Sequence, residues 1–222
     1  MNRLFLPVAA LLFMAACTSE PNADKAVVAD AQAVTTPASG NAYKADLNQS
    51  TVDWTGTKPT GRHTGQFKLQ DGSIMADATG ITGGEFVIDI NSMRITDADT
   101  EGTSKLRGHL LSSDFFHADS ADYKTAKFQI TAVKAGTDTT GDKKILMKDA
   151  THTITGNLTL KGVSKSVTFP ARVAMTDASI TTDADFNIDR SQWNMSYGAD
   201  KSLGNKMINS DVNIKLHIVA NK

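Results

Sequence analysis

Residues 153–161 read Thr153-Ile154-Thr155-Gly156-Asn157-Leu158-Thr159-Leu160-Lys161, and this stretch decides the fold. Its large apolar side chains, Ile154, Leu158 and Leu160, keep to alternate positions, and threonine, asparagine and lysine stand between them. A period of two places apolar residues on one face of a β-strand and polar residues on the other. One dry face and one wet face are typical of an antiparallel sheet.

The same alternation recurs on both sides of this stretch. Apolar residues occupy alternate positions in further runs, which contain Trp54, Phe67, Phe86, Phe128, Phe169, Phe186 and Ile214. Asp71-Gly72 and Lys161-Gly162 predict turns between runs, and Pro170 predicts an edge position or a bulge. About eight or nine strands result, which is enough to close a barrel, although a two-sheet sandwich would share the pattern. The sequence therefore predicts an all-β, antiparallel fold.

Two segments break the alternation. Residues 103–116 predict a short helix on which Leu106, His109 and Leu110 share one face. Residues 189–198 form a turn-rich insertion that carries an arginine and two large aromatic residues. Both segments are candidate lids at one end of the barrel.

The N-terminal residues are predicted to be a targeting signal rather than part of the folded domain. Residues 1–16 combine a basic residue with an apolar stretch too short to span a bilayer, as in a signal peptide. Met14-Ala15-Ala16-Cys17 resembles the lipobox of bacterial lipoproteins, which implies cleavage before Cys17 and acylation of its thiol. An ordinary secretory signal cut after Ala16 is the alternative. Residues 17–42 contain too few large apolar side chains to fold alone, and predict a flexible tether before a domain at 43–222.

Composition narrows the classes of function. The 222 residues carry 23 basic and 24 acidic side chains, a formal charge of −1, which argues against a nucleic-acid partner. The single cysteine excludes an internal disulfide framework and a multi-cysteine zinc site. A mildly acidic domain has little attraction for anionic headgroups, so the acyl chains are expected to provide the membrane anchor.

Four segments, in order, resemble the YceI-like polyisoprenoid-binding family of bacterial envelope proteins. The first is Ser50-Thr51-Val52-Asp53-Trp54-Thr55-Gly56-Thr57-Lys58 with His63-Thr64-Gly65, and the second contains Ser113-Asp114-Phe115-Phe116. The third is Gly156-Asn157-Leu158-Thr159-Leu160-Lys161-Gly162, and the fourth contains Asp189-Arg190-Ser191-Gln192-Trp193. The resemblance implies a lipocalin-like antiparallel β-barrel of about eight strands. Its interior would hold an isoprenoid lipid of the polyprenyl quinone or polyprenyl phosphate type.

The resemblance also suggests which residues contact this lipid. The candidate barrel lining comprises Trp54, Phe67, Leu69, Phe86, Ile88, Phe128, Ile130, Leu158, Leu160, Phe169, Phe186 and Ile214. The same residues could instead fill a solid core. The candidate headgroup or mouth residues are His109, Phe115, Phe116, Arg190, Trp193 and Tyr197. Arg190 could bind a headgroup or brace the mouth by pairing with Asp114 or Asp189.

Catalysis has little support in the sequence. His109 and His117 are eight residues apart, a spacing that suits no helical metal pair, and neither a nucleophile elbow nor a nucleotide-binding glycine motif occurs. We therefore expect no metal and no cofactor other than the lipid, and non-enzymatic lipid binding or transport in the bacterial envelope, periplasmic or at the outer membrane. A filled-core module that binds a protein partner, and a metal-assisted enzyme, are the alternatives. The oligomeric state, homodimer included, stays open.

Overall fold

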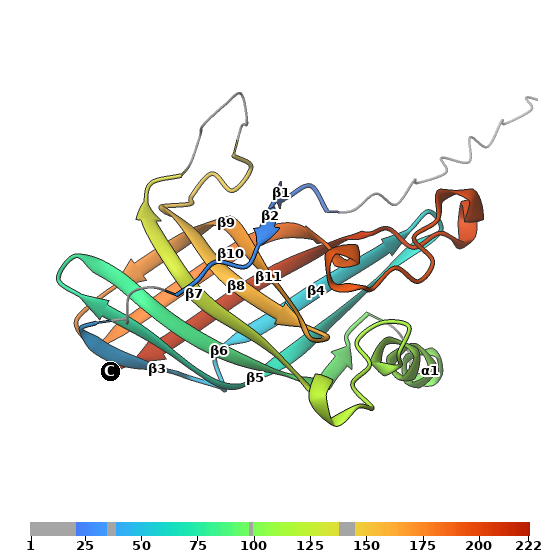
Figure 1. Ribbon diagram of the computed structural model, residues 1–222, viewed down its shortest axis with the longest axis horizontal. Helices are drawn as coiled ribbons and strands as arrows, with labels where there is room; N and C mark the ends of the chain where they lie inside the picture. Colours follow the sequence, from blue (N-terminus) through green and yellow to red (C-terminus); the bar gives the residue numbers. More distant parts are fainter. Residues whose placement is uncertain (1–20, 35–38, 98–99, 138–144) are drawn as a thin grey trace, which may run out of the picture.

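The alternating runs form eight strands that close into an antiparallel barrel in the computed structural model, which describes residues 21–34, 39–97, 100–137 and 145–222 (Figure 1). The barrel strands are β4 (Thr51–Lys58), β5 (Gly61–Asp77), β6 (Gly80–Ile95), β7 (Thr125–Ala135), β8 (His152–Leu160), β9 (Val163–Met175), β10 (Ser179–Asp189) and β11 (Asp211–Asn221). Each strand pairs with the next, and β11 pairs with β4. The predicted barrel is thus confirmed over the sandwich.

The period of two sets which side chains point inward. Ile154, Leu160, Phe67 and Phe186 are buried inside the barrel, whereas polar neighbours face outward. The predicted turn at Asp71-Gly72 is wrong, because β5 runs through it with a register shift between Leu69 and Asp71. A side chain at residue 72 would meet the ring of Phe86 at 2.5 Å, so this glycine makes room for core packing rather than for a turn.

One short strand completes the wall beside β4. β3 (Asn41–Ala45) pairs with the ends of β11 and β5, on the same side of the barrel as β4. This part of the wall is therefore formed by two strands, β3 and β4, which are connected by a turn at residues 46–50.

The helical segments gather at one end of the barrel, which we call the mouth end. They are α1 (Thr100–Leu111), η1 (Ala121–Tyr123), η2 (Arg190–Trp193) and η3 (Lys201–Lys206) (Figure 1). The two predicted lids therefore lie at the same end. The opposite end, which carries the β5–β6 hairpin at residues 78–79, is the far end. None of the described helices is long and apolar enough to cross a membrane.

Two further strands precede the barrel and fill a gap in its wall. β9 and β10 pair directly only where Arg172–Met175 lies opposite Ile180–Asp183. Toward the mouth, β1 (Asp24–Lys25) pairs with β10 in parallel, and β2 (Val27–Asp30) pairs with β9 in antiparallel. Pro170 lies between the stretch of β9 that pairs with β2 and the stretch that pairs with β10. The missing N–H of proline is tolerated at such a break in the ladder.

The predicted flexible tether over residues 17–42 is therefore wrong for residues 21–34. Ala26 is buried with the core, and its N–H donates to the carbonyl of Asn187. Asn157 holds the backbone of Gln32 at both its N–H and its carbonyl, at 2.9 and 2.7 Å. The segment has no core of its own, but unpaired backbone groups of β9 and β10 offer it hydrogen bonds.

Candidate functional site

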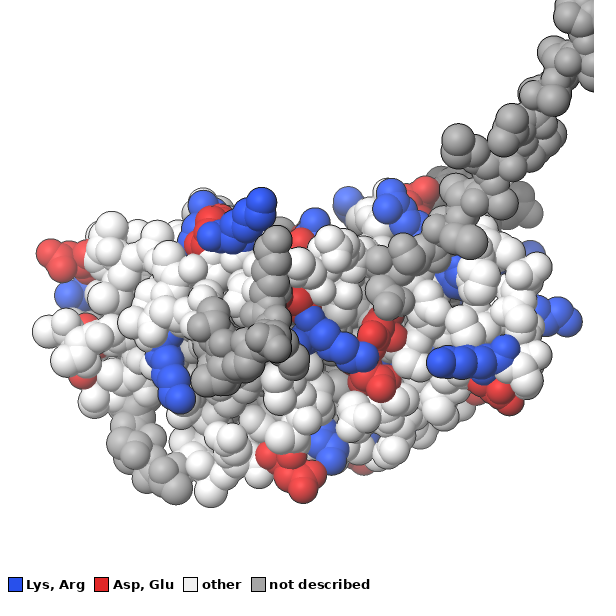
Figure 2. Space-filling model, turned by 90° about the horizontal axis from the view of Figure 1, so that it is seen from above, with Lys and Arg blue, Asp and Glu red and all other residues white. Residues whose placement is uncertain are grey.

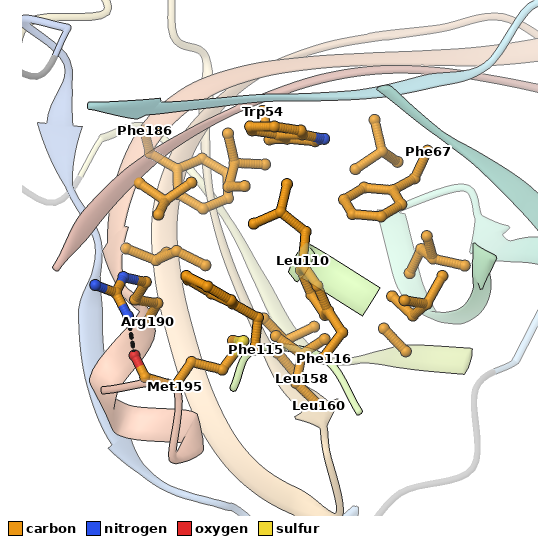
Figure 3. Close-up of a pocket in the computed structure, with 18 of the residues that line it drawn as sticks. Trp54, Phe67, Leu110, Phe115, Phe116, Leu158, Leu160, Phe186, Arg190 and Met195 are labelled. Carbon is orange, nitrogen blue, oxygen red and sulfur yellow. Dashed lines mark hydrogen bonds between the residues drawn. The ribbon is translucent and has the colours of Figure 1, made fainter. Parts of the chain in front are cut away.

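The barrel encloses a cavity of about 610 Å³ that reaches the mouth end (Figure 3). All twelve predicted lining residues lie on its wall, namely Trp54, Phe67, Leu69, Phe86, Ile88, Phe128, Ile130, Leu158, Leu160, Phe169, Phe186 and Ile214. They therefore surround an open space rather than a solid core. The volume lies within the usual range of small-molecule sites.

Aromatic rings and a glycine shape the middle of this cavity. The rings of Phe169 and Phe186 stack at 4.2 Å, and Phe128 packs against Phe169 at 5.8 Å. A side chain at Gly156 would meet the Phe128 ring at 2.4 Å, so glycine at this position of β8 lets the ring lie against the wall. The interior offers a ligand an apolar surface with few polar groups.

The helix side of the mouth is aromatic. Leu110, Phe115 and Phe116 project into the cavity opposite Trp54 and Phe67, and the Phe116 ring meets Phe67 edge-on at 5.5 Å (Figure 3). Phe115 is thus part of the wall as well as of the mouth.

His109 and Tyr197 complete this aromatic side. The His109 ring lies 4.7 Å from the ring of Tyr197, and its Nε2 lies 2.8 Å from the Asp114 carboxylate. The Tyr197 side chain is half exposed at the rim. Among the described residues, no three His, Cys, Asp or Glu side chains gather as a metal site would require.

Arg190 braces the mouth, but its partners are backbone carbonyls rather than Asp114 or Asp189. The guanidinium donates to the carbonyl oxygens of Asn209, Met195, Tyr197 and Ile208, and the Phe115 ring lies 5.4 Å from its central carbon. Burial lowers the pKa of Arg190, and the nearby carboxylate of Asp189 partly opposes this shift. Because its hydrogen bonds tie together the loops at 195–197 and 208–209, Arg190 fixes the shape of the opening.

Trp193 does not lie at the mouth opening, contrary to the sequence prediction. It is fully buried, it does not line the cavity, and its indole N–H donates to the carbonyl of Leu158 at 3.0 Å. A tryptophan whose polar tip is satisfied by a strand carbonyl packs η2 against the barrel. Sequence spacing alone could not tell this inner position from the rim.

Three basic residues at the rim of the cavity were not among the predicted mouth residues. Lys58, Arg62 and Lys206 line the opening, where the β4–β5 hairpin faces η3. Of the residues that line the described cavity, none is aspartate or glutamate, and all the charged ones, Arg190 included, are basic. The parity of β4 carried a signal for Lys58, because it lies four residues after the inward-facing Trp54. The opening therefore favours an anionic group beside an apolar chain.

The fold and this cavity define a lipocalin-like barrel with an apolar interior that reaches the mouth end. The family model for the YceI-like domain matches residues 43–220, and the chain belongs to this family. No curated protein matches it.

Three solved structures are similar. BcnA of Burkholderia cenocepacia is 26% identical, with a TM-score of 0.59 over 80% of this chain and 99% of that chain. A polyisoprenoid binding domain from Saccharophagus degradans, implicated in plant cell wall breakdown, is 17% identical, with a TM-score of 0.57 over 81% and 97%. The YceI protein of Campylobacter jejuni is 21% identical, with a TM-score of 0.50 over 71% and 84%. The last two support the fold alone.

Proposed function

We propose that this protein binds one isoprenoid lipid, of the polyprenyl quinone or polyprenyl phosphate type, and carries or stores it in the bacterial cell envelope without chemical change. The observation that carries the proposal is the continuous apolar cavity that reaches the mouth end. The similarity of the fold to that of a polyisoprenoid binding domain supports the same ligand class.

The cavity suits a slender apolar tail. Burial of apolar surface stabilises such a complex by about 25 cal/mol per Å², so the tail needs few polar partners. Aromatic rings from β7, β9 and β10 line its middle, and the charged residues among the described ones that line it lie toward the mouth. The tail would therefore occupy the barrel, with the headgroup near His109, Tyr197 and the basic rim.

We further propose that the mature protein is anchored through acyl chains on Cys17, in the periplasm or at the outer membrane. The support is the sequence Met14-Ala15-Ala16-Cys17, with the only cysteine where acylation requires it. Several acyl chains give firm attachment, whereas a single chain gives marginal binding.

Native mass spectrometry of protein purified gently from a bacterial envelope tests the ligand. A bound polyprenyl species is the expected result, and delipidated protein should take up a polyprenyl quinone or a polyprenyl phosphate. Protein that carries no lipid and ignores both compounds would contradict the proposal and favour a surface that binds a protein partner.

A matched pair of variants tests the cavity itself. Ile214→Trp should fill part of the cavity and weaken lipid uptake about tenfold or more, because Ile214 lies on its wall. Lys215→Trp places the same side chain on the next residue of β11, which faces outward and is exposed, and should leave uptake unchanged. Thermal unfolding of both variants separates lost binding from lost folding. Equal uptake by the two would mean that lipid does not enter the barrel.

A further inference from the structure

We infer that the mouth end of this barrel rests on an anionic bilayer surface, with η3 and the β4–β5 hairpin against the lipid headgroups. This inference rests on the proposed acylation of Cys17, and adds the orientation of the barrel and the chemistry of the surface that it meets. Chain length, charge and exposed apolar side chains support it independently.

The first support is the short link between the acylation site and the barrel wall. The carbonyl of Pro21 accepts a hydrogen bond from the Asn187 side chain at 2.9 Å, so the chain is held against β10 at this residue. Pro21 lies four residues after Cys17, and an extended chain covers at most about 14 Å over those four steps. The anchor therefore cannot act as the long tether that composition alone suggested.

The position of Asn187 decides which end of the barrel the anchor can reach. Asn187 lies two residues, about 7 Å, from the mouth end of β10, and eight residues, about 26 Å, from its far end. A link of about 14 Å therefore covers the distance to the mouth end and falls short of the far end. Acyl chains on Cys17 would hold the mouth end close to the membrane.

The second support is charge. The rim near η3 carries Lys58, Arg62, Lys201 and Lys206, and Figure 2 shows basic side chains projecting at this end of the molecule. Two carboxylates, Asp200 and Asp97, also lie near this rim and offset half of these four positive charges. Asp200 accepts from the N–H of Ser202, and Asp97 lies 3.4 Å from His63. A chain of formal charge −1 thus presents a locally basic end, which an anionic surface attracts.

The third support is an exposed apolar side chain between basic ones. Leu203 is 44% exposed in the middle of η3, and Lys201 and Lys206 mark the two ends of the same short segment. Tyr197, another rim residue, is 47% exposed. Apolar tips flanked by lysines are typical of segments that lie in the headgroup region of a bilayer.

This orientation has a consequence for lipid transfer. The same rim residues, Lys58, Arg62, Lys206 and Tyr197, line the opening of the cavity. With the opening on the bilayer, an isoprenoid tail would pass from the membrane into the barrel without crossing bulk water. The large cost of exposing its apolar surface would be avoided.

A fluorescence quenching experiment tests the orientation. The acylated protein is placed in phosphatidylcholine vesicles with about one third phosphatidylglycerol and a spin-labelled quencher lipid. An environment-sensitive fluorophore is attached at Leu203→Cys in η3, or at Ala78→Cys in the exposed β5–β6 hairpin of the far end. Acylated Cys17 leaves the introduced thiol as the only reactive one. We expect strong quenching at 203 and almost none at 78. Equal quenching at the two sites, or none at 203, would overturn the inference.

Charge variants test the chemistry of the surface. Arg62→Glu with Lys206→Glu should weaken quenching at 203 in anionic vesicles, because each surface charge contributes about fivefold to such binding. Lys134→Glu with Lys148→Glu, at exposed sites away from this rim, should leave quenching unchanged. Equal effects of the two pairs would show that the basic rim has no special role, and would overturn this part of the inference.

Separate readouts distinguish this inference from the proposed anchor and ligand. Mass analysis of Cys17, and flotation of wild-type protein with vesicles against Cys17→Ser, report on acylation alone. If acylation fails, partition of the unacylated protein into anionic vesicles still tests the rim, and no preference for anionic over neutral vesicles would overturn the inference. Lipid uptake is measured independently, so a failure of the proposed ligand leaves the quenching result intact.

Discussion

At the far end of the barrel β9 and β10 pair directly, whereas toward the mouth the same two strands are separated by residues 24–30. The direct pairing covers Arg172–Met175 and Ile180–Asp183. The remainder is filled by β1 on the side of β10 and by β2 on the side of β9. The boundary between two neighbouring strands is therefore closed in two different ways.

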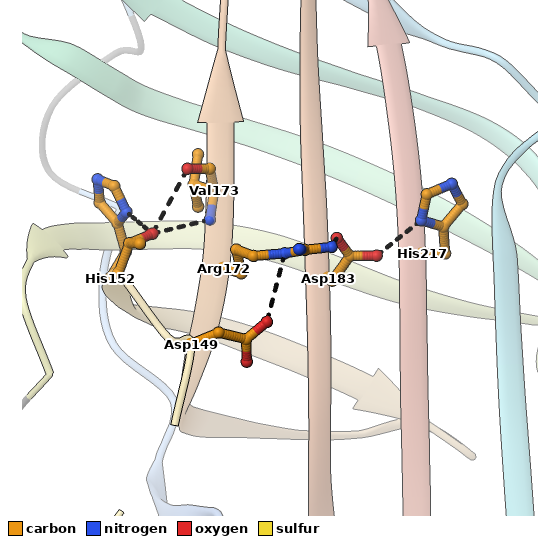
Figure 4. A network of polar contacts seen from close by, with 7 residues as sticks. Asp149, His152, Arg172, Val173, Asp183 and His217 are labelled. Carbon is orange, nitrogen blue, oxygen red and sulfur yellow. Dashed lines mark hydrogen bonds and ion pairs between the residues drawn. The ribbon is translucent and has the colours of Figure 1, made fainter. Parts of the chain in front are cut away.

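The far half carries a network of charged groups on its outer surface (Figure 4). Arg172 Nη2 donates to the Asp183 carboxylate at 2.7 Å, and Nδ1 of His217 on β11 lies 2.7 Å from the same carboxylate. Asp149 lies 3.6 Å from Arg172. Asp183 thus links β9, β10 and β11 in addition to the backbone ladder.

The mouth half depends on residues outside the family domain. The YceI-like match begins at residue 43, whereas β1 and β2 end at residue 30. The family fold in this chain therefore leaves a gap beside the cavity residues Val167 and Phe186, and the N-terminal segment completes the wall there.

The largest expected effect follows from removing that segment. Deletion of residues 21–34 should destabilise the protein by about 3 kcal/mol, because buried Ala26 and many backbone hydrogen bonds to β9 and β10 are lost. Urea unfolding measures the change. Replacement of the same residues by glycine and serine at equal length is the matched control: it keeps the backbone hydrogen bonds, loses the buried side chain of Ala26 and adds backbone entropy, and should be less destabilising than the deletion. Unchanged stability in both variants would mean that the wall closes without the segment.

The cavity wall could be predicted from the sequence, whereas the N-terminal strands β1 and β2 could not. Alternation of apolar residues predicted the cavity wall, because inward parity on a strand follows directly from the period of two. It could not predict β1 and β2, since a short polar segment joins the wall through backbone groups that every residue possesses. Composition correctly indicated that residues 21–34 cannot form a core of their own. It could not reveal that they complete the core of the barrel.

At the mouth, too, the sequence did not predict contacts that depend on backbone groups. Arg190 was expected to pair with a carboxylate, but four carbonyls from the connection between β10 and β11 converge on it. Tertiary folding brings these acceptors together, and no sequence pattern marks a carbonyl as an acceptor. Lys58 was predictable in principle, since parity along β4 extends from Trp54 to the hairpin, whereas Lys206 reaches the opening only through the path of η3.

A smaller effect is expected in the far half. Asp183→Asn should cost about 1 kcal/mol at neutral pH, because solvent screening limits the value of its partly exposed ion pairs. Burial alone would raise the pKa of Asp183, but hydrogen bonds from His217 and Arg172 outweigh it, so this pKa lies below its ordinary value of 3.8. The stabilisation is thus present above that value and is lost as the pH falls through the lowered pKa.

Urea unfolding of wild type and Asp183→Asn across pH measures this difference. The gap between the two should be widest near neutral pH and should close in acid, below about pH 4. Asp177→Asn, which removes a carboxylate from the exposed turn between β9 and β10, is the control and should show no such trend. A gap that stays constant down to acid pH would show that the Asp183 charge does not stabilise this half.

The smallest effect is expected from the charged contact on the mouth half. Lys165 Nζ lies 3.0 Å from the Asp30 carboxylate, whose side chain is 97% exposed. Lys165→Met keeps the apolar stem and removes the charge, and should change the free energy of unfolding by less than about 0.5 kcal/mol. Added salt should shrink even this difference, since exposed pairs are screened. A loss comparable to that of the deletion would mean that charge, rather than the backbone ladder, holds β2 in the wall. The two halves would then be closed by the same means.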